Sequence, residues 1–205
     1  MMPTQQWLGR HALTWLLLAQ FAVIAPHAAR LPLWVDGIWL ACACWRVMVY
    51  QGRWSFPGRA VKLLLVIGCL AGLRYSYASL LGLEVMVALL VASFSFKLLE
   101  AATRREALLL LFLGYFVAVT QFLFEQGLGS VVYMLLPIAL LTAALVALHQ
   151  AQPPLHFSWQ PLRTSAVMLG QALPLMLLLF LVFPRFAPLW QVPLPSSGAR
   201  SGMSD

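Results

Sequence analysis

The sequence predicts an all-α fold, a polytopic transmembrane helical bundle of about seven helices. Three observations predict it. Hydrophobic residues make up 62% of the 205 residues and charged residues only 9%, whereas soluble domains are ~45–50% apolar and ~25% charged. The apolar residues form successive runs close to the ~20 residues that cross a hydrocarbon core as a helix. The charges lie mostly at the ends of these runs, where membrane topology places them.

The apolar runs differ in strength. The first weakens near Pro26, and the second carries Trp and Tyr towards its ends as interface anchors. The third is the weakest, because Arg74 interrupts it after about 16 Å of helix, so it needs snorkelling, a partner or a partial span. Pro137 predicts a kink in the sixth run. The predicted spans, which make up one transmembrane domain over residues 1–183, are residues 11–28, 33–50, 62–80, 81–99, 107–124, 130–148 and 165–183.

The distribution of Lys and Arg orients the bundle. With the N-terminus in the cytoplasm, nine basic residues fall on the cytoplasmic side and four on the other, as the positive-inside rule favours. Loss of the third span would flip every later loop and weaken this asymmetry. We therefore expect seven crossings of a bacterial inner membrane and a periplasmic linker tail over residues 184–205. The cytoplasmic set is Arg10, Arg46, Arg53, Arg59, Lys62, Lys97, Arg104, Arg105 and Arg163, and the outer set is Arg30, Arg74, Arg185 and Arg200.

A cluster of charged residues separates the fourth and fifth runs. Lys97, Glu100 and Arg104 are spaced by three and four residues, so on a helix they share one face. The Lys97 stem can lie along lipid while its ammonium reaches the headgroups, and Arg104 and Arg105 fall in the loop. We interpret this charged cluster as a cytoplasmic hairpin that fixes the register and topology of the two runs. A partner-docking or regulatory face on this loop is the alternative.

Polar residues near the outer side suggest further contacts. Arg74 and Glu84 stand at opposite ends of the connection between the third and fourth runs, so they are a possible ion pair; independent solvation at the headgroups is the alternative. Thr120, Gln121 and Gln171 fit hydrogen bonds between helices better than a substrate pathway.

No residue pattern in the chain predicts catalysis, a metal site or a cofactor site. Cys42, Cys44 and Cys69 are isolated within apolar runs and match no zinc or redox spacing. The sequence has no H-E-x-x-H, and its basic residues do not form the polar stripe of a nucleic-acid-binding face. A transporter would show ionisable groups deep in several spans or broken helices in matching halves. Transport and a partner-binding scaffold stay as alternatives for a stand-alone protein.

Two stretches resemble a known family. The first stretch contains a KLLE segment and a basic pair, and it resembles the N-terminal membrane domain of the bacterial transglutaminase-like TgpA family. It reads GLEVMVALLVASFSFKLLEAATRREALLLLFLGYFVAVTQFLF. The tail, with Phe183-Pro184-Arg185 and Pro188-Leu189-Trp190, is similar to the stretch that leads into the family's extracytoplasmic portion. Within this tail, we expect Pro184, Arg185, Pro188 and Trp190 to fix the exit at the outer interface.

The resemblance implies a function outside the chain itself. Family members continue into a periplasmic transglutaminase-like domain with a Cys-His-Asp triad, and the sequence ends before any such domain. None of the three cysteines can be assigned as that nucleophile, because no histidine has a position beside them. The chain is then the membrane anchor of such a domain, or a stand-alone relative. Its expected partners are the lipid bilayer and either that periplasmic domain or a neighbouring membrane protein.

Overall fold

The computed structural model describes residues 8–77, 79, 82–125, 127–150 and 157–182. Within these ranges the chain is helical, with short connections and no strand. The helices are α1 (Arg10–Ala28), α2 (Leu33–Tyr50), α3 (Arg59–Ser76), α4 (Leu83–Glu100), α5 (Arg104–Thr120), the 3₁₀ turn η1 (Gln121–Leu123), α6 (Leu128–His149) and α7 (Gln160–Val182).

Within the described ranges, five of the seven α-helical segments are long and apolar enough to cross a membrane: α1, α2, Arg104–Leu123, α6 and Gln160–Leu179. The helices α3 and α4 have 18 residues each but carry three charged side chains apiece. The all-helical fold that the sequence predicts is therefore present. The crossing of α3 and α4 stays a prediction.

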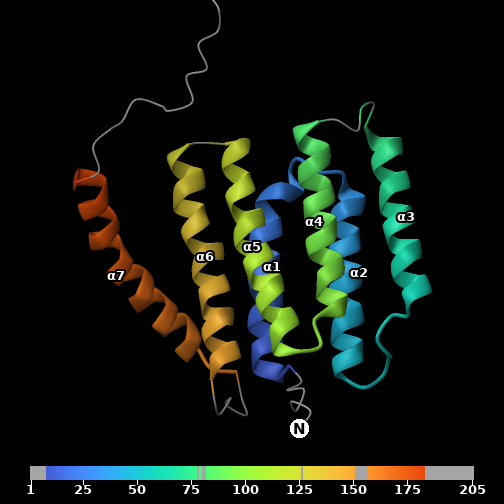
Figure 1. Cartoon of the computed structure of the whole chain (residues 1–205), viewed down its shortest axis with the longest axis horizontal. Helices are drawn as coiled ribbons and strands as arrows, with labels where there is room; N and C mark the ends of the chain where they lie inside the picture. The colour runs from blue at the N-terminus through green and yellow to red at the C-terminus, as the bar shows by residue number, and fades with distance from the viewer. Residues whose placement is uncertain (1–7, 78, 80–81, 126, 151–156, 183–205) are drawn as a thin grey trace, which may run out of the picture. The chain divides into compact units, whose positions relative to one another are not determined.

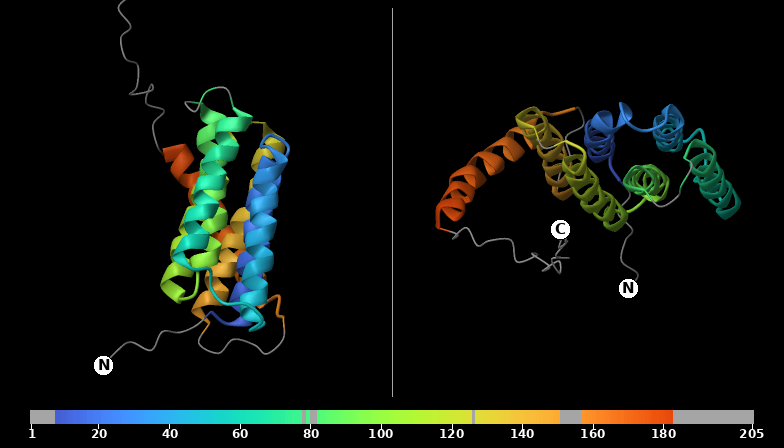
Figure 2. Two further views of the ribbon diagram at one scale, coloured as in Figure 1. Left: turned by 90° about the vertical axis from the view of Figure 1, so that its right-hand side faces the viewer. Right: turned by 90° about the horizontal axis from the view of Figure 1, so that it is seen from above.

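The chain divides into two compact units, residues 1–169 and residues 170–205. In the first unit, successive helices run in opposite directions, so that every connection lies at one of two ends (Figure 1). The helix α4 packs against α2, α3 and α5, and α1 packs against α6, α5 and α2. Figure 2 shows the same neighbours in a view along the helices. The helices α1, α4 and α5 thus form the centre of this unit.

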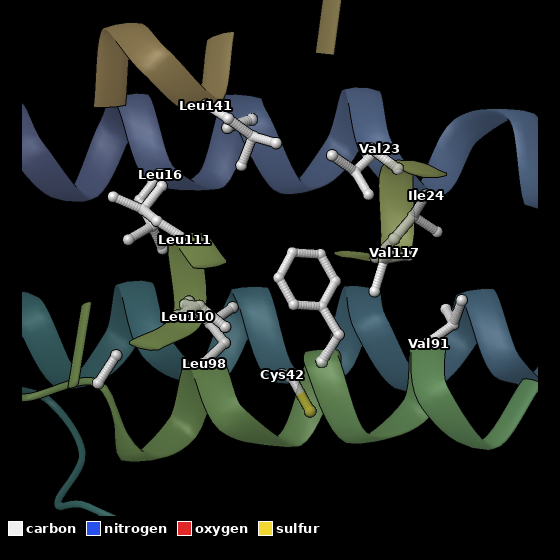
Figure 3. Close-up of a cluster of buried hydrophobic side chains, with 14 of the residues drawn as sticks. Leu16, Val23, Ile24, Cys42, Val91, Leu98, Leu110, Leu111, Val117 and Leu141 are labelled. Atoms are coloured by element: carbon white, nitrogen blue, oxygen red, sulfur yellow. The ribbon is translucent and has the colours of Figure 1, made fainter. Parts of the chain in front are cut away.

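The core lies between these central helices (Figure 3). Phe94 of α4 and Val91 one turn before it are fully buried, beside Leu110 and Leu111 of α5 and Leu141 of α6. Gly114 of α5 permits this approach, because a Cβ there would lie 2.8 Å from Leu141 Cδ2 and 3.1 Å from Phe94 Cζ. Small residues at helix interfaces are the usual means of close packing in membranes.

The described part of the second unit is the C-terminal half of α7. Its described side chains from residue 171 to residue 182 are all exposed and are mostly apolar. Pro174 lies inside this helix. The predicted exit residues Pro184, Arg185, Pro188 and Trp190 lie outside the described residues.

Candidate functional site

At the end of the bundle that carries the α4–α5 turn, Glu100 joins α3 to α4. Its two carboxylate oxygens accept hydrogen bonds from Lys97 Nζ at 2.8 Å and from Lys62 Nζ at 3.0 Å. Lys97 is one turn earlier on the same helix, whereas Lys62 comes from the first turn of α3. Glu100 lies just beyond the predicted fourth span, and the hydrogen bonds from Lys97 and then Lys62 lower its pKa. The three side chains form an ionised cluster that holds the two helices together.

The structure does not bring Arg104 into this cluster. The helix α4 ends at Glu100, and Ala101 to Thr103 turn the chain before α5 begins at Arg104. The four-residue spacing between Glu100 and Arg104 is therefore not a spacing along one helix. No ion pair in the described part of the chain includes Arg104 or Arg105. The sequence shows the Lys97–Glu100 spacing, but it gives no local signal for Lys62.

The turn itself is held by hydrogen bonds to its backbone. Thr103 and Glu106 form a capping box: Glu106 Oε2 accepts from the Thr103 and Ala102 N–H groups at 2.9 Å each, and Thr103 Oγ1 accepts from the Glu106 N–H. The Leu8 N–H donates to the Ala102 carbonyl at 3.3 Å. The first turn of α5 and the preceding backbone are thus fixed.

Arg46 of α2 supports the same turn from inside the bundle. It is only 4% exposed, and its Nη2 donates to the Ala101 carbonyl at 2.8 Å. Its guanidinium lies over the Phe56 ring, 5.1 Å from the centroid. A cation beside the C-terminal carbonyls of α4 also favours the helix dipole. Sequence reasoning counted Arg46 as one more basic residue; the available signal was a lone charge among the apolar residues of the second run.

Halfway along the bundle, Gln20 links three helices. Its side chain is 1% exposed. Its Nε2 donates to the Phe94 carbonyl of α4 at 3.1 Å, and its Oε1 accepts from Trp39 Nε1 of α2 at 3.3 Å. Sequence reasoning did not single out this residue, although a lone glutamine in an apolar run is a signal for such a link.

At the opposite end, Arg30 and Glu125 connect the end of α1 to the link before α6. Arg30 Nη2 lies 3.2 Å from Glu125 Oε1, and the guanidinium lies over the Phe124 ring at 5.4 Å. Ser130 Oγ donates to the other carboxylate oxygen of Glu125 at 2.9 Å. Neither residue of this pair was predicted to have a partner, because they are far apart in the sequence.

Arg74 and Glu84 lie at the same end, in the last turn of α3 and the first turn of α4. Both are exposed, and the ion pairs among the described residues do not include one between them. Each instead carries the charge that its own helix end favours, a cation at the C-terminus and an anion at the N-terminus. Pairing between them stays a prediction.

A buried polar contact lies beneath this end. His27 of α1 is 1% exposed, with Nδ1 at 3.1 Å from the Val23 carbonyl and Nε2 at 3.2 Å from Thr120 Oγ1 of α5. The neighbouring Gln121 is buried, and its Oε1 has no hydrogen-bond partner among the residues that the structure describes. It lines a hollow of about 320 Å³ together with Glu125, Ser130 and Tyr133. The contact between Thr120 and His27 links α5 to α1, as the position of Thr120 inside an apolar run suggests.

These clusters join helices and do not assemble reacting groups. Cys42 and Cys69 are buried, Cys44 is exposed, and all three are free thiols. Within the described ranges, no group of three or more His, Cys, Asp or Glu side chains is placed to hold a metal ion. The polar side chains described above instead make contacts between the helices of a scaffold.

Comparison with known proteins agrees with a membrane module. The family model described as "TgpA N-terminal domain" matches residues 15–205. A protein-glutamine gamma-glutamyltransferase of Pseudomonas aeruginosa is 48% identical over 199 residues, which cover 96% of this chain and 29% of that relative. The chain thus spans less than a third of the relative's length. No solved structure matches the chain.

Proposed function

This chain belongs to the TgpA N-terminal domain family, and from that premise we propose that it anchors and orients a transglutaminase-like domain at the outer face of the bacterial inner membrane. The observation that carries the proposal is the pattern of similarity: nearly the whole chain matches a transferase of which it spans only 29%. The catalytic groups of such an enzyme then belong to the remaining length. The polar contacts between the helices of the bundle suit a rigid support for the attached domain.

The distribution of charge supports a cytoplasmic N-terminus. The start of α1 lies at the same end of the bundle as the α2–α3 and α4–α5 connections (Figure 1). Nine Lys and Arg residues belong to the helix ends and connections on this side, whereas Arg30 and Arg74 belong to the α1–α2 connection and the last turn of α3 on the other side. The positive-inside rule assigns the first end to the cytoplasm. An odd number of crossings then delivers the chain after α7 to the periplasm, where the attached domain works.

The positions of the charges on α3 and α4 support seven crossings. On α3 they occupy the first turn and the last turn, with an uninterrupted apolar stretch from Leu63 to Leu73 between them. On α4, Glu84 is in the first turn and Lys97 is in the last turn. Charged side chains at helix ends reach the headgroups while the apolar centre lies in hydrocarbon. We therefore propose that α3 and α4 cross as a hairpin whose ends are polar.

Transport is the weaker candidate function. Among the described residues, no Asp, Glu, His, Lys or Arg side chain is buried in the middle of the bundle. Gln20 and Ser95 are buried there, and both are hydrogen-bonded within the bundle. Carriers place ionisable groups or broken helices at this depth. A partner-binding scaffold differs from the anchor proposal only in what the bundle holds.

Reporter fusions test this topology. Alkaline phosphatase, which is active only outside the cytoplasm, is fused in separate strains after Ser79, Arg105 and Asp205, with green fluorescent protein at the same sites as the converse reporter. We expect phosphatase activity after Ser79 and Asp205 and none after Arg105. Phosphatase activity after Arg105 together with silence after Asp205 would overturn the orientation, and silence after Ser79 would overturn the crossing of α3.

A second experiment tests the anchor role. The full-length protein is compared with a version that lacks residues 1–182 and is directed to the periplasm by a cleavable signal peptide. We expect the full-length protein in the membrane fraction and the shortened one in the soluble periplasmic fraction, with transferase activity on a peptide amide in both. Membrane retention of the shortened version would show that this bundle is not the anchor.

A further inference from the structure

The groove between α3 and α4 at the Lys62 end is built like a binding site for a lipid headgroup. It encloses about 220 Å³. Its polar end is formed by the two ammonium groups and the carboxylate of the Lys62–Glu100–Lys97 cluster. Its wall is apolar and consists chiefly of Leu65, Val66, Phe96 and Leu99. The groove therefore joins a charged end to a surface that fits a hydrocarbon chain.

The charged end has unused hydrogen-bond donors. Each ammonium group has three N–H donors, and each donates to one oxygen of Glu100. The described contacts give neither lysine a further acceptor. Two donors therefore remain on each side chain, and Glu100 holds the two groups close together. Two lysines and one glutamate leave a net charge of +1, which equals in magnitude the charge of one phosphodiester.

The position of the cluster favours a membrane lipid. Lys62 is in the first turn of α3 and Lys97 is in the last turn of α4, so both lie where the apolar centres of these helices end. Their side chains are 38% and 31% exposed, and the ammonium groups are therefore open to a ligand. At this depth a bilayer presents phosphate groups above the first methylene groups of its acyl chains.

We propose that Lys62 and Lys97 together bind the phosphate of an anionic phospholipid whose acyl chain lies along the apolar wall of this groove. The lipid adds a further contact between α3 and α4, beside the Lys62–Glu100 ion pair. The inference rests on the membrane location of the bundle but not on its orientation or on the attached enzyme. Its test is independent of transferase activity for that reason.

Native mass spectrometry of the full-length protein in detergent tests the proposal. Phosphatidylglycerol, with a net charge of −1, is titrated against zwitterionic phosphatidylcholine, which has the same phosphate but no net charge. We expect one phosphatidylglycerol to bind at low lipid concentration, with an affinity roughly tenfold above that for phosphatidylcholine. The variant Lys62→Gln/Lys97→Gln should lose this preference, and Lys62→Arg/Lys97→Arg should keep it.

Two controls separate the site from its surroundings. Arg53→Gln removes one exposed cation at the same end without touching the groove, and it should leave the preference unchanged. Glu100→Gln removes the carboxylate charge that competes with the phosphate, keeps an amide oxygen that can accept a hydrogen bond from a lysine, and leaves both lysines in place. Phosphatidylglycerol should therefore bind at least as tightly, and this variant tests the site even if the double lysine variant fails to fold. An equal loss in Arg53→Gln, or a loss in Glu100→Gln, would overturn the proposal.

A third arm distinguishes a lipid from free phosphate. Inorganic phosphate at millimolar concentration is added to the protein–phosphatidylglycerol mixture. We expect the bound lipid to persist, because the apolar wall contributes to its binding and a free ion cannot use that wall. Displacement of the lipid by inorganic phosphate would assign the two lysines to a soluble phosphate ligand and overturn the lipid proposal.

Discussion

Gln20 on α1 donates a hydrogen bond from its Nε2 to the carbonyl oxygen of Phe94 on α4 at 3.1 Å, at a depth where the side chain is 1% exposed. The same amide accepts from Trp39 on α2. Replacing Gln20 with Leu removes both bonds and leaves the Trp39 N–H without its acceptor. We expect a loss of about 0.6–2 kcal/mol in stability, measured by unfolding in mixed micelles. Ser93→Ala, which removes only a bond within α4, is the control and should have a smaller effect.

Gly114 fixes the separation of α5 from α6. Gly114→Ala places a methyl group 2.8 Å from Leu141 Cδ2, and Leu141 is buried, so it has little room to move. We expect this variant to cost about 1–3 kcal/mol, seen as a lower midpoint of thermal unfolding in detergent. Gly68→Ala is the matched control, because beyond its chain neighbours and its own helix backbone no atom lies within 4 Å of the added Cβ, and alanine favours the helix.

The double variant Gly114→Ala/Leu141→Ala separates a clash from a general helix effect. Leu141→Ala alone creates a cavity and should be destabilising by about 2–5 kcal/mol. The added methyl of the first substitution fills part of that space, so the two effects should be less than additive. Strict additivity would indicate that the Gly114 substitution does not act through Leu141.

Arg46 is predicted to stabilise the α4–α5 turn and not merely to orient the chain. Arg46→Gln removes the bond to the Ala101 carbonyl and the contact with Phe56, so we expect a loss of about 1–3 kcal/mol. Arg59→Gln is the control, because Arg59 is an exposed cation at the same end of the bundle. If both variants unfold at the same denaturant concentration, Arg46 acts through charge alone.

The helical content follows from the sequence because each element depends on a local property. A run of apolar residues about one membrane thickness long satisfies its backbone hydrogen bonds only as a helix. The start of α5 also has a local signal, since Thr103 and Glu106 have the spacing of a capping box. The weak third run is helical as well, over Arg59–Ser76, because its charges lie towards its ends.

The contacts between helices could not be predicted in the same way. Lys62 and Glu100 are 38 residues apart, and Arg30 and Glu125 are still farther apart, so no periodicity points to either pair. The sequence favoured Glu100 with Arg104 because their spacing fits one helix. The chain turns at Ala101, and that break changes which side chains meet. Partners at long range depend on which helices are neighbours, and this information is not local.

Charge reversals at Arg74 and Glu84 distinguish an ion pair from two separate helix-end effects. Each residue carries the sign that its helix end favours. We therefore expect Arg74→Glu and Glu84→Arg each to lower stability by about 0.3–1 kcal/mol and the double reversal to lower it by their sum. Thermal unfolding at low salt measures the three variants. Recovery in the double variant would instead establish the pair that the sequence predicts.

The contact between His27 and Thr120 gives the last prediction, which rests on counting protons. The Val23 carbonyl can only accept a hydrogen bond, so the nearby Nδ1 of His27 carries a proton. In a neutral imidazole Nε2 is then an acceptor, so we predict that the single proton of the Thr120 hydroxyl is donated to it at 3.2 Å and not to the Val117 carbonyl at 2.6 Å. Thr120→Val keeps the shape of the side chain but removes this donor from a fully buried contact. We expect it to cost about 1–3 kcal/mol, whereas Thr120→Ser should stay much closer to the unchanged protein. The two variants are compared by thermal unfolding in the same detergent. Equal stability of Thr120→Val and Thr120→Ser would show that the hydroxyl donates to its own helix, at the Val117 carbonyl 2.6 Å away, and contributes nothing to the link between α1 and α5.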